Sequence, residues 1–285
     1  MRRRISAYGL TFSLPLLIWQ LLFFVFPLVF LIALSFWTVR NFRMQADFDT
    51  VNWTTMYGRA IFWQAYGTTL TLAAGAAVLT SLLAFPVAYF LSFVVAPRHK
   101  AMWIFLITIP FWTSYLIRVF LWKVILGYNG VVNSGLKSLG IIEQPLSFLL
   151  YNTGSIVVTL AHAYAPFAIL PIYVALEKID RSLLEAGRDL GESRLMTFWR
   201  VTLPLAMPGV LAAVLIVFIP TIGDYVTPTL IGGGKIPMVA NLIQAQMLDI
   251  DNKPLGSAIA VTAMGIVGVL SLIFLFLNRR FLRMR

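Results

Sequence analysis

The chain has 285 residues, of which 60% are hydrophobic and only 12% are charged, and its mean hydropathy is +0.86. A water-soluble protein of this length needs more polar surface, so the composition excludes a soluble enzyme or binding module. The absence of cysteine excludes disulfides and thiolate metal sites. The net charge of +11 is compatible either with nucleic-acid binding or with a signal that orients the protein in a membrane.

Six apolar runs are long enough to cross hydrocarbon, which takes about 20 residues of helix. Backbone amides in lipid must be satisfied within the segment, and the runs are too long and too uniform for barrel strands. The sequence therefore predicts an all-α integral membrane protein with six transmembrane helices, at Leu10–Trp37, Thr68–Val95, Ala101–Val124, Ser155–Leu176, Met207–Ile231 and Ser257–Leu277.

The basic residues predict the orientation of these helices. With the N-terminus inside the cell, most of the 22 basic residues fall on the cytoplasmic side, including Arg2, Arg3 and Arg4 at the start of the chain. This bias follows the positive-inside rule, and an even number of helices puts both termini in the cytoplasm. The charge is thus an orientation signal and a contact for membrane lipid, not a nucleic-acid footprint. The first run is too long for a cleaved signal peptide, so we expect an uncleaved first helix.

The predicted segments follow from these helices. We expect an N-terminal tail and first helix at 1–40, an external loop at 41–66, a five-helix core at 67–277 with a cytoplasmic insert at 177–206, and a basic tail at 278–285. Two short helices are predicted on the external side. Val131–Leu139 is expected to lie in the membrane interface, and a helix with Pro237 at its first position is expected to reach about Leu248 and rest on the outer membrane face.

The insert Ser182–Pro204 is the most distinctive polar segment. Ser182 followed three residues later by Glu185 has the form of a capping box, and Gly191 is placed to end that short helix in the left-handed conformation. A second helical stretch is expected at Ser193–Val201, with Pro204 and Pro208 marking the return to the membrane. A helix this short must pack on something to be stable. It is either an ordinary amphipathic loop or a docking loop for a separate motor protein.

The insert resembles the "EAA" signature of permease subunits in bacterial ABC importers. That pattern is Glu-Ala-Ala, three residues, Gly, nine residues, Ile, one residue, Leu-Pro, and this chain departs from it only by Gly187 for Ala and Val201 for Ile. In the family this segment is the coupling helix that sits in a groove of the cytoplasmic ATPase. The resemblance implies an ATPase-coupling role for Glu185, Ala186, Gly187, Gly191, Val201, Leu203 and Pro204.

The resemblance narrows to the PotB/PotH-type spermidine/putrescine permeases. It is carried by Pro110–Thr113 with Leu116–Arg118, by Leu176–Asp180, and by Pro220–Gly233. It implies a type I (MetI-like) importer in the bacterial inner membrane, with a second homologous permease subunit, a dimeric ABC ATPase and a periplasmic polyamine-binding protein. The chain itself would hold no cofactor and catalyse no reaction, because ATP and Mg would bind to the partner ATPase.

Asp224 is the only acidic residue well inside an apolar run, and Pro220, Gly223 and Pro228 loosen the helix around it. We expect it either to face the translocation path and attract a cationic amine, or to cap a helix fragment or pair with Arg118. Three aromatic residues are candidates to bind an alkylammonium chain through cation–π contacts: Trp112, Tyr115 and Tyr225. Their alternative role is packing or anchoring at the membrane interface. Arg118 is expected to extend to the outer interface, with gating as its alternative.

The sequence lacks the motifs of nucleotide-binding and metal-binding proteins. Gly232–Lys235 has no phosphate-loop spacing, and the isolated His99 and His162 predict no metal site. The alternatives that remain open are a related ABC importer for another small organic solute (amino acid or opine-like), a stand-alone secondary transporter, and a membrane enzyme. The last two predict inverted repeats or clustered acid–base residues, which the sequence lacks.

Overall fold

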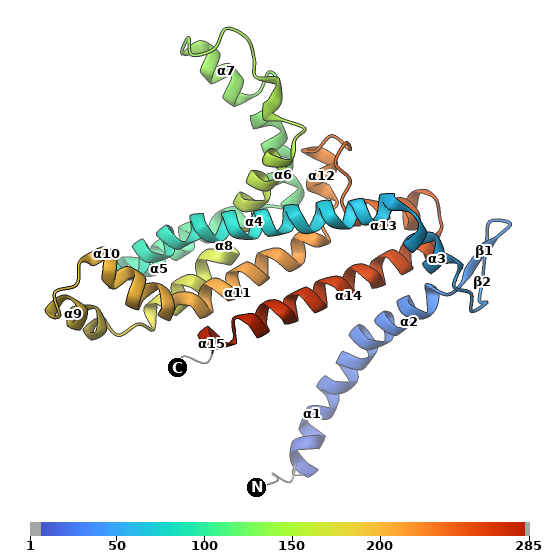
Figure 1. The fold of residues 1–285 in the computed structure, drawn as a ribbon, viewed down its shortest axis with the longest axis horizontal. Coiled ribbons are helices and arrows are strands. Elements are labelled where there is room, and N and C mark those ends of the chain that lie inside the picture. The colour runs from blue at the N-terminus through green and yellow to red at the C-terminus, as the bar shows by residue number, and fades with distance from the viewer. Residues whose placement is uncertain (1–6, 283–285) are drawn as a thin grey trace. The chain divides into compact units, whose positions relative to one another are not determined.

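The computed structural model describes residues 7–282 and contains six helical segments that are long and apolar enough to cross a membrane (Figure 1). This confirms the predicted number of transmembrane helices. The segments run over Phe12–Leu34, Ala60–Phe93, Tyr115–Ser138, Thr153–Glu177, Arg194–Ile222 and Lys253–Leu277. Arg2, Arg3, Arg4, Arg283 and Arg285 lie outside the described residues.

The chain forms two compact units, residues up to 63 with 242–265, and residues 64–241 with 266 onward. The first unit begins with α1 (Ala7–Gln20), a π-helical turn at Leu21–Val25 and α2 (Phe26–Leu34). The helix ends at Leu34 rather than at Trp37, because Ser35 Oγ donates to Ile32 O and the Asn52 side chain donates to Ser35 O and Trp37 O. These contacts turn the chain out of the helix into a hairpin.

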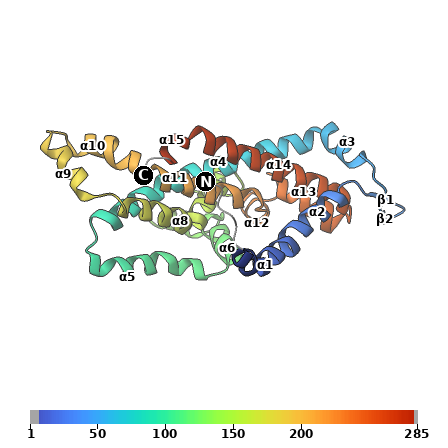
Figure 2. The ribbon, with the colours of Figure 1, turned by 90° about the horizontal axis from the view of Figure 1, so that it is seen from below.

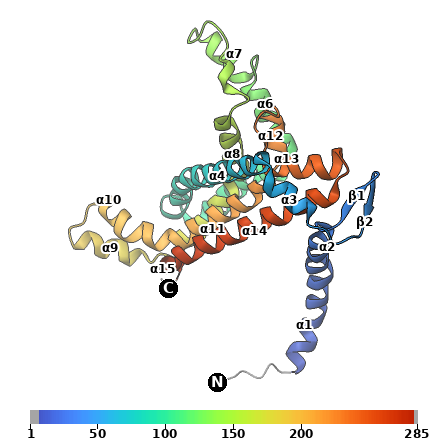
Figure 3. The ribbon, with the colours of Figure 1, turned by 45° about the vertical axis from the view of Figure 1, so that its right-hand side comes forward.

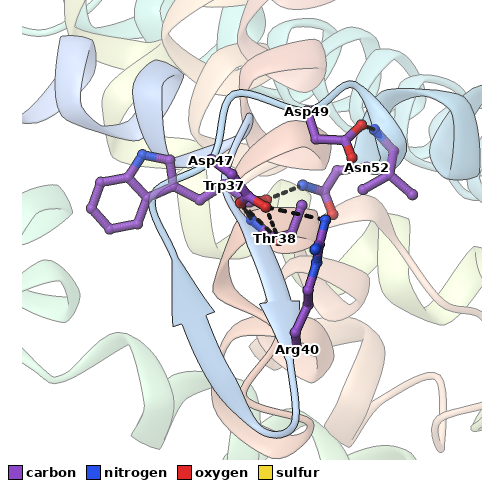
Figure 4. Close-up of polar contacts among 7 residues, drawn as sticks. Trp37, Thr38, Arg40, Asp47, Asp49 and Asn52 are labelled. Carbon is purple, nitrogen blue, oxygen red and sulfur yellow. Dashed lines mark hydrogen bonds and ion pairs between the residues drawn. The ribbon is translucent and has the colours of Figure 1, made fainter.

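That hairpin, β1 (Thr38–Arg40) with β2 (Arg43–Gln45), is the one sheet among the described residues, and it was not predicted. Asn41 and Phe42 connect the strands and both have positive φ (52° and 60°), as a two-residue hairpin turn of this kind requires. Asp47 closes the base, where its carboxylate accepts from Thr38 N and Oγ1 and pairs with Arg40 at 3.3 Å (Figure 4). α3 (Val51–Gly58) follows.

The second unit is built on three helices packed side by side: α4 (Ala60–Phe93), α8 (Thr153–Glu177) and α11 (Leu203–Ile222) (Figures 1 and 2). Their buried faces form one apolar cluster that includes Ala88, Ile172 and Val217. Small residues allow close approach. At Gly209 a Cβ atom would lie only 2.5 Å from Ala175 Cβ and from Pro171 O.

The third predicted transmembrane helix is interrupted. The structure has α5 (Pro97–Thr108), a 3₁₀ turn at Ile109–Trp112, a break at Thr113–Ser114 and then α6 (Tyr115–Leu126). Pro110 lacks an amide proton and clashes with the preceding turn, so a continuous α-helix is disfavoured there. The apolar run did not reveal this break, because hydrophobicity reports burial in lipid and not helix continuity.

The fifth predicted helix also has different bounds. α10 (Arg194–Thr197) continues through a π-helical turn at Phe198–Thr202 into α11, so Pro204 does not interrupt the helix. The π turn lies just before Pro204, where the missing proline N–H disrupts regular α-helical bonding. At the other end α11 stops at Ile222, and α12 (Val226–Leu230) is a separate fragment. The prediction of one helix from Met207 to Ile231 is therefore wrong.

The short helices complete the unit. α7 (Val131–Ser138) matches the helix predicted at Val131–Leu139 and stands off the bundle (Figure 3). α13 (Val239–Gln244) starts two residues after Pro237, and its first amide, Val239 N, donates to Thr69 Oγ1. Val239 is 1% exposed and packs inside the protein, whereas Leu242, Ile243 and Met247 are half-buried, and the placement of this helix on the outer membrane face stays a prediction. The chain continues through a π turn at Ala245–Asp249 to α14 (Lys253–Leu277) and α15 (Arg279–Leu282).

Candidate functional site

The insert between α8 and α11 folds as a short helix, a tight turn and a second helix. Asp180 is the N-cap of α9 (Arg181–Asp189), and its carboxylate accepts from Ser182 N at 3.0 Å. These hydrogen bonds hold the pKa of the Asp180 carboxyl below its ordinary value. The predicted capping box of Ser182 and Glu185 is therefore wrong, because Ser182 lies inside the helix and an acidic residue two positions earlier does the capping.

The C-terminus of α9 matches the prediction for Gly191, which has φ of +82°. Its amide donates to Arg188 O, and the amide of Glu192 donates to Gly187 O. This pair of bonds is the Schellman arrangement, which reverses the chain within two residues. A residue with a Cβ is strained at this φ, so glycine suits the position.

Gly187 faces the second helix of the insert. It is buried, and a Cβ there would lie 3.3 Å from both Thr197 Cγ2 and Thr197 Oγ1. Arg200 and Glu192 form an ion pair at 2.8 Å, which ties the second helix to the turn. The two helices thus form one compact body, α9–α10.

Three contacts fix this body to the bundle. Arg181 Nη2 donates to Ser92 O at the end of α4, at 3.4 Å. Leu184 packs against the apolar cluster of α4, α8 and α11. The ring of Phe198 lies edge-on to Phe85, with centroids 5.6 Å apart. These contacts connect α9–α10 to α4 and to the apolar cluster that α4 forms with α8 and α11.

No described residue covers the outer surface of α9–α10. Glu185 and Ala186 are exposed, and Glu185 takes part in no ion pair among residues 7–282. Large apolar side chains lie open on the same segment: Leu183, Leu190, Leu195, Met196 and Trp199. Val201, Leu203 and Pro204 are half-buried. Exposed apolar groups among charged ones are typical of a surface that receives a partner.

A second polar site lies where two interrupted helices meet. Asp224 sits in the gap between α11 and α12 and is 6% exposed. Its Oδ1 accepts from Val226 N (2.9 Å) and Thr227 N (3.2 Å), and its Oδ2 accepts from the hydroxyl of Tyr115, the first residue of α6, at 2.6 Å. The carboxylate therefore joins the break before α6 to the break after α11.

Arg118 lies beside this site and is buried, with 8% of its surface exposed. Its Cζ is 4.9 Å from the ring centroid of Phe111 and 5.9 Å from that of Tyr115, and Nη1 donates to Ala163 O. It forms no ion pair with Asp224 among the described residues, so both its predicted extension to the interface and its predicted pairing are wrong. The aromatic faces hold the cation in place of a carboxylate.

The structure brings together only part of the predicted substrate set. Tyr115 contacts Asp224, whereas Trp112 is 75% exposed and packs edge-on to Phe105, and Tyr225 is 47% exposed. Sequence reasoning missed Thr227, whose amide binds Asp224 and whose hydroxyl lies 2.8 Å from that of Tyr115. Asp224 accepts from the amides two and three positions further on, so it caps α12, which was one of the alternatives predicted for it; an Asp just after Gly223 was the available signal.

Within the described part of the chain, no group of three or more His, Asp or Glu side chains is placed to hold a metal ion. His162 instead accepts a hydrogen bond from Trp122 Nε1 at 3.1 Å.

Comparison with known proteins identifies the family. A family model described as "Binding-protein-dependent transport system inner membrane component" matches residues 6–283. The chain belongs to this family. It is therefore a multi-pass component of a bacterial inner-membrane transport system and not an enzyme, as predicted.

Individual relatives agree with this family. The spermidine/putrescine permease PotB of Haemophilus influenzae is 34% identical over 263 residues, which cover 92% of this chain and 91% of that protein. PotB of Escherichia coli is 32% identical over 256 residues, covering 90% and 92%. A subunit of a bacterial ABC transporter for alginate import has a TM-score of 0.74 at 19% identity, covering 95% and 94%. The predicted ABC importer permease fold is confirmed; the orientation of the termini stays a prediction.

Proposed function

We propose that this chain is the transmembrane permease subunit of an ATP-driven importer for the polyamines spermidine and putrescine, and that it forms half of the translocation path. The observation that carries the proposal is the buried carboxylate of Asp224 at the junction of two broken helices. Broken helices within a membrane protein are tolerated where they line a cavity, and a carboxylate there attracts a cationic amine. The relatives named PotB support polyamines as the substrate class.

In this proposal Asp224 and Tyr115 are the polar centre of the path. An ammonium group that approaches Asp224 finds an acceptor that is already oriented by two backbone amides and a phenol. Tyr115 supplies an aromatic face beside it, and the exposed rings of Tyr225 and Trp112 are candidates for the approach to the site.

The α9–α10 body is the docking element for the ATPase in the same proposal. Its exposed Glu185, Ala186 and apolar side chains form the contact, while Gly187 and Gly191 keep the body compact. Val201 lies in the π-helical turn that leads into α11, and Leu203 and Pro204 are the first two residues of α11. A dimeric ABC ATPase with its ATP and Mg, a second homologous permease and a periplasmic polyamine-binding protein complete the importer. The structural relative for alginate was also solved with a periplasmic protein bound, which supports a partner of that kind.

The substrate role is tested by Asp224→Asn in the importer reconstituted in proteoliposomes. The amide keeps an oxygen for Val226 N and Thr227 N, so assembly should survive, whereas one charged hydrogen bond to the amine is lost. Such a bond contributes about 1.5–3 kcal/mol, so the KM for spermidine should rise by roughly 10- to 150-fold. Glu143→Gln, which removes an exposed charge elsewhere, is the matched control. An unchanged KM in Asp224→Asn would refute the role.

The docking role is tested by co-purification of the ATPase. Glu185→Arg reverses a charge on the proposed contact surface and should reduce the amount of ATPase retained. Glu143→Arg makes the same change on an exposed loop and should not. Equal retention in both variants would contradict docking through α9.

Arg118 favours a second candidate substrate, a small amino-acid-like solute that carries both an ammonium and a carboxylate group. Its buried guanidinium lies next to Tyr115 and lacks a carboxylate partner among the described residues. Uptake assays with spermidine and with a zwitterionic amino acid separate the two. Transport of the amino acid alone, abolished by Arg118→Gln, would favour the second candidate.

A further inference from the structure

A polar cavity of about 560 Å³ lies in the first unit, at the ends of three membrane-spanning segments. Its lining comes from the hairpin and α3, between the first and second segments, and from residues 246–255, which lead into the sixth. The end of the first segment and the starts of the second and sixth lie on one membrane face, because successive segments alternate in direction. The cavity is therefore at the level of the lipid headgroups.

Aromatic side chains on the same unit agree with this depth. The rings of Phe36, Trp53, Tyr57 and Trp63 follow one another with centroid separations of 5.7, 6.3 and 5.6 Å. Tryptophan and tyrosine concentrate where the headgroups meet the hydrocarbon. The cavity thus opens where a phospholipid presents its polar end.

The charges on the lining have both signs. Arg40 and Arg59 are basic and Asp49 is acidic. Arg40 is already paired with Asp47 (Figure 4). Arg59 and Asp49 take part in no ion pair among the described residues. One oxygen of Asp49 accepts from Val51 N, which leaves the other available. The cavity therefore offers one unpaired cation and one unpaired anion.

Neutral acceptors accompany these charges. The side-chain amide of Asn52 donates to Ser35 O and to Trp37 O, so both of its protons are used. Its carbonyl oxygen can accept a hydrogen bond from a ligand. Gln246 and Asn252 add amide groups from the other side of the cavity. An ammonium with several N–H bonds fits the oxygen-rich part, and a phosphate fits Arg59.

We propose that this cavity binds the zwitterionic headgroup of phosphatidylethanolamine, with the phosphate on Arg59 and the primary ammonium between Asp49 and Asn52. The pairing selects this lipid over two others. Phosphatidylcholine has no N–H to donate, and phosphatidylglycerol brings an anion without the cation that Asp49 requires. The inference is independent of the polyamine assignment.

The test measures which lipid the assembled importer retains, by native mass spectrometry after exposure to equimolar phosphatidylethanolamine, phosphatidylcholine and phosphatidylglycerol with identical acyl chains. We expect retention of phosphatidylethanolamine over phosphatidylcholine by about tenfold, the change produced by one charged hydrogen bond. Arg59→Gln should lower retention of phosphatidylethanolamine and phosphatidylglycerol alike. Asp49→Asn should lower only that of phosphatidylethanolamine. Arg43→Gln, an exposed hairpin residue outside the lining, is the control.

Two results overturn the proposal. Equal retention of the three lipids, unchanged by Arg59→Gln, means that lipid surrounds the protein without a site. Displacement of the lipid by soluble O-phosphoethanolamine at equal concentration means that the cavity takes a soluble headgroup, because acyl chains in the membrane should otherwise favour the lipid strongly.

Discussion

The close approach of α8 to α11 at Gly209 predicts the effect of adding one methyl group there. In Gly209→Ala the new Cβ would lie 2.5 Å from Ala175 Cβ and 2.5 Å from Pro171 O. Carbon atoms in contact are about 3.5–4.0 Å apart, so the two helices must separate by roughly 1 Å. Both opposing atoms are rigid, because one belongs to the backbone and the other to an alanine. Overpacking of this kind costs about 1–3 kcal/mol.

The assay is the thermal melting of the purified subunit in detergent. Each kcal/mol should lower Tm by roughly 2–4 °C at this chain length. Gly268→Ala is the matched control, because its Cβ would meet nothing within 4 Å and alanine gains about 1 kcal/mol over glycine in a helix. Gly209→Ala should therefore melt lower than the wild type and Gly268→Ala should not. If the two variants melt alike, the close packing of α8 on α11 is not the constraint described here.

Three further predictions concern the insert and the hairpin. Gly191→Ala places a Cβ at φ of +82° and should weaken α9 by about 1 kcal/mol, seen as faster amide exchange over 181–192; unchanged exchange would contradict the Schellman turn. Phe198→Ala removes the edge contact with α4 and should reduce substrate-stimulated ATP hydrolysis without loss of the ATPase from the complex; full stimulation would show that α4 does not carry the motion. The Thr38 hydrogen bonds hold the pKa of Asp47 below its ordinary value of about 3.9. The Asp47 carboxylate therefore stabilises the hairpin at pH values above its ordinary pKa, and this stabilisation is lost as the pH falls through the lower pKa of the folded state. Hairpin amides should consequently exchange faster at acid pH. Asp47→Asn should remove this pH dependence, and a dependence that persists in the variant would assign it to another group.

Much of the architecture was predictable because it depends on local composition. Six apolar runs give six membrane-spanning segments, since each must satisfy its own backbone in lipid. Gly191 was predictable for a similar reason: only glycine adopts the left-handed conformation without strain, so its place after a short amphipathic helix predicts the end of that helix. The spacing of the insert pointed to the transport family without any tertiary information.

Tertiary structure decided the identity of the contacts. Asp180 rather than Ser182 caps α9, because the point where α8 ends selects which polar residue precedes the first turn. Tyr115 reaches Asp224 across 109 positions in the sequence, and no periodicity within one segment predicts that pairing. Arg118 is buried against Phe111 because α6 starts after a break that hydrophobicity does not register. Local sequence thus determined which segments enter the membrane. The tertiary structure decided that the breaks at Thr113–Ser114 and at Gly223–Tyr225 bring polar side chains together. The reason is that distances between residues remote in the sequence are fixed only when the helices pack.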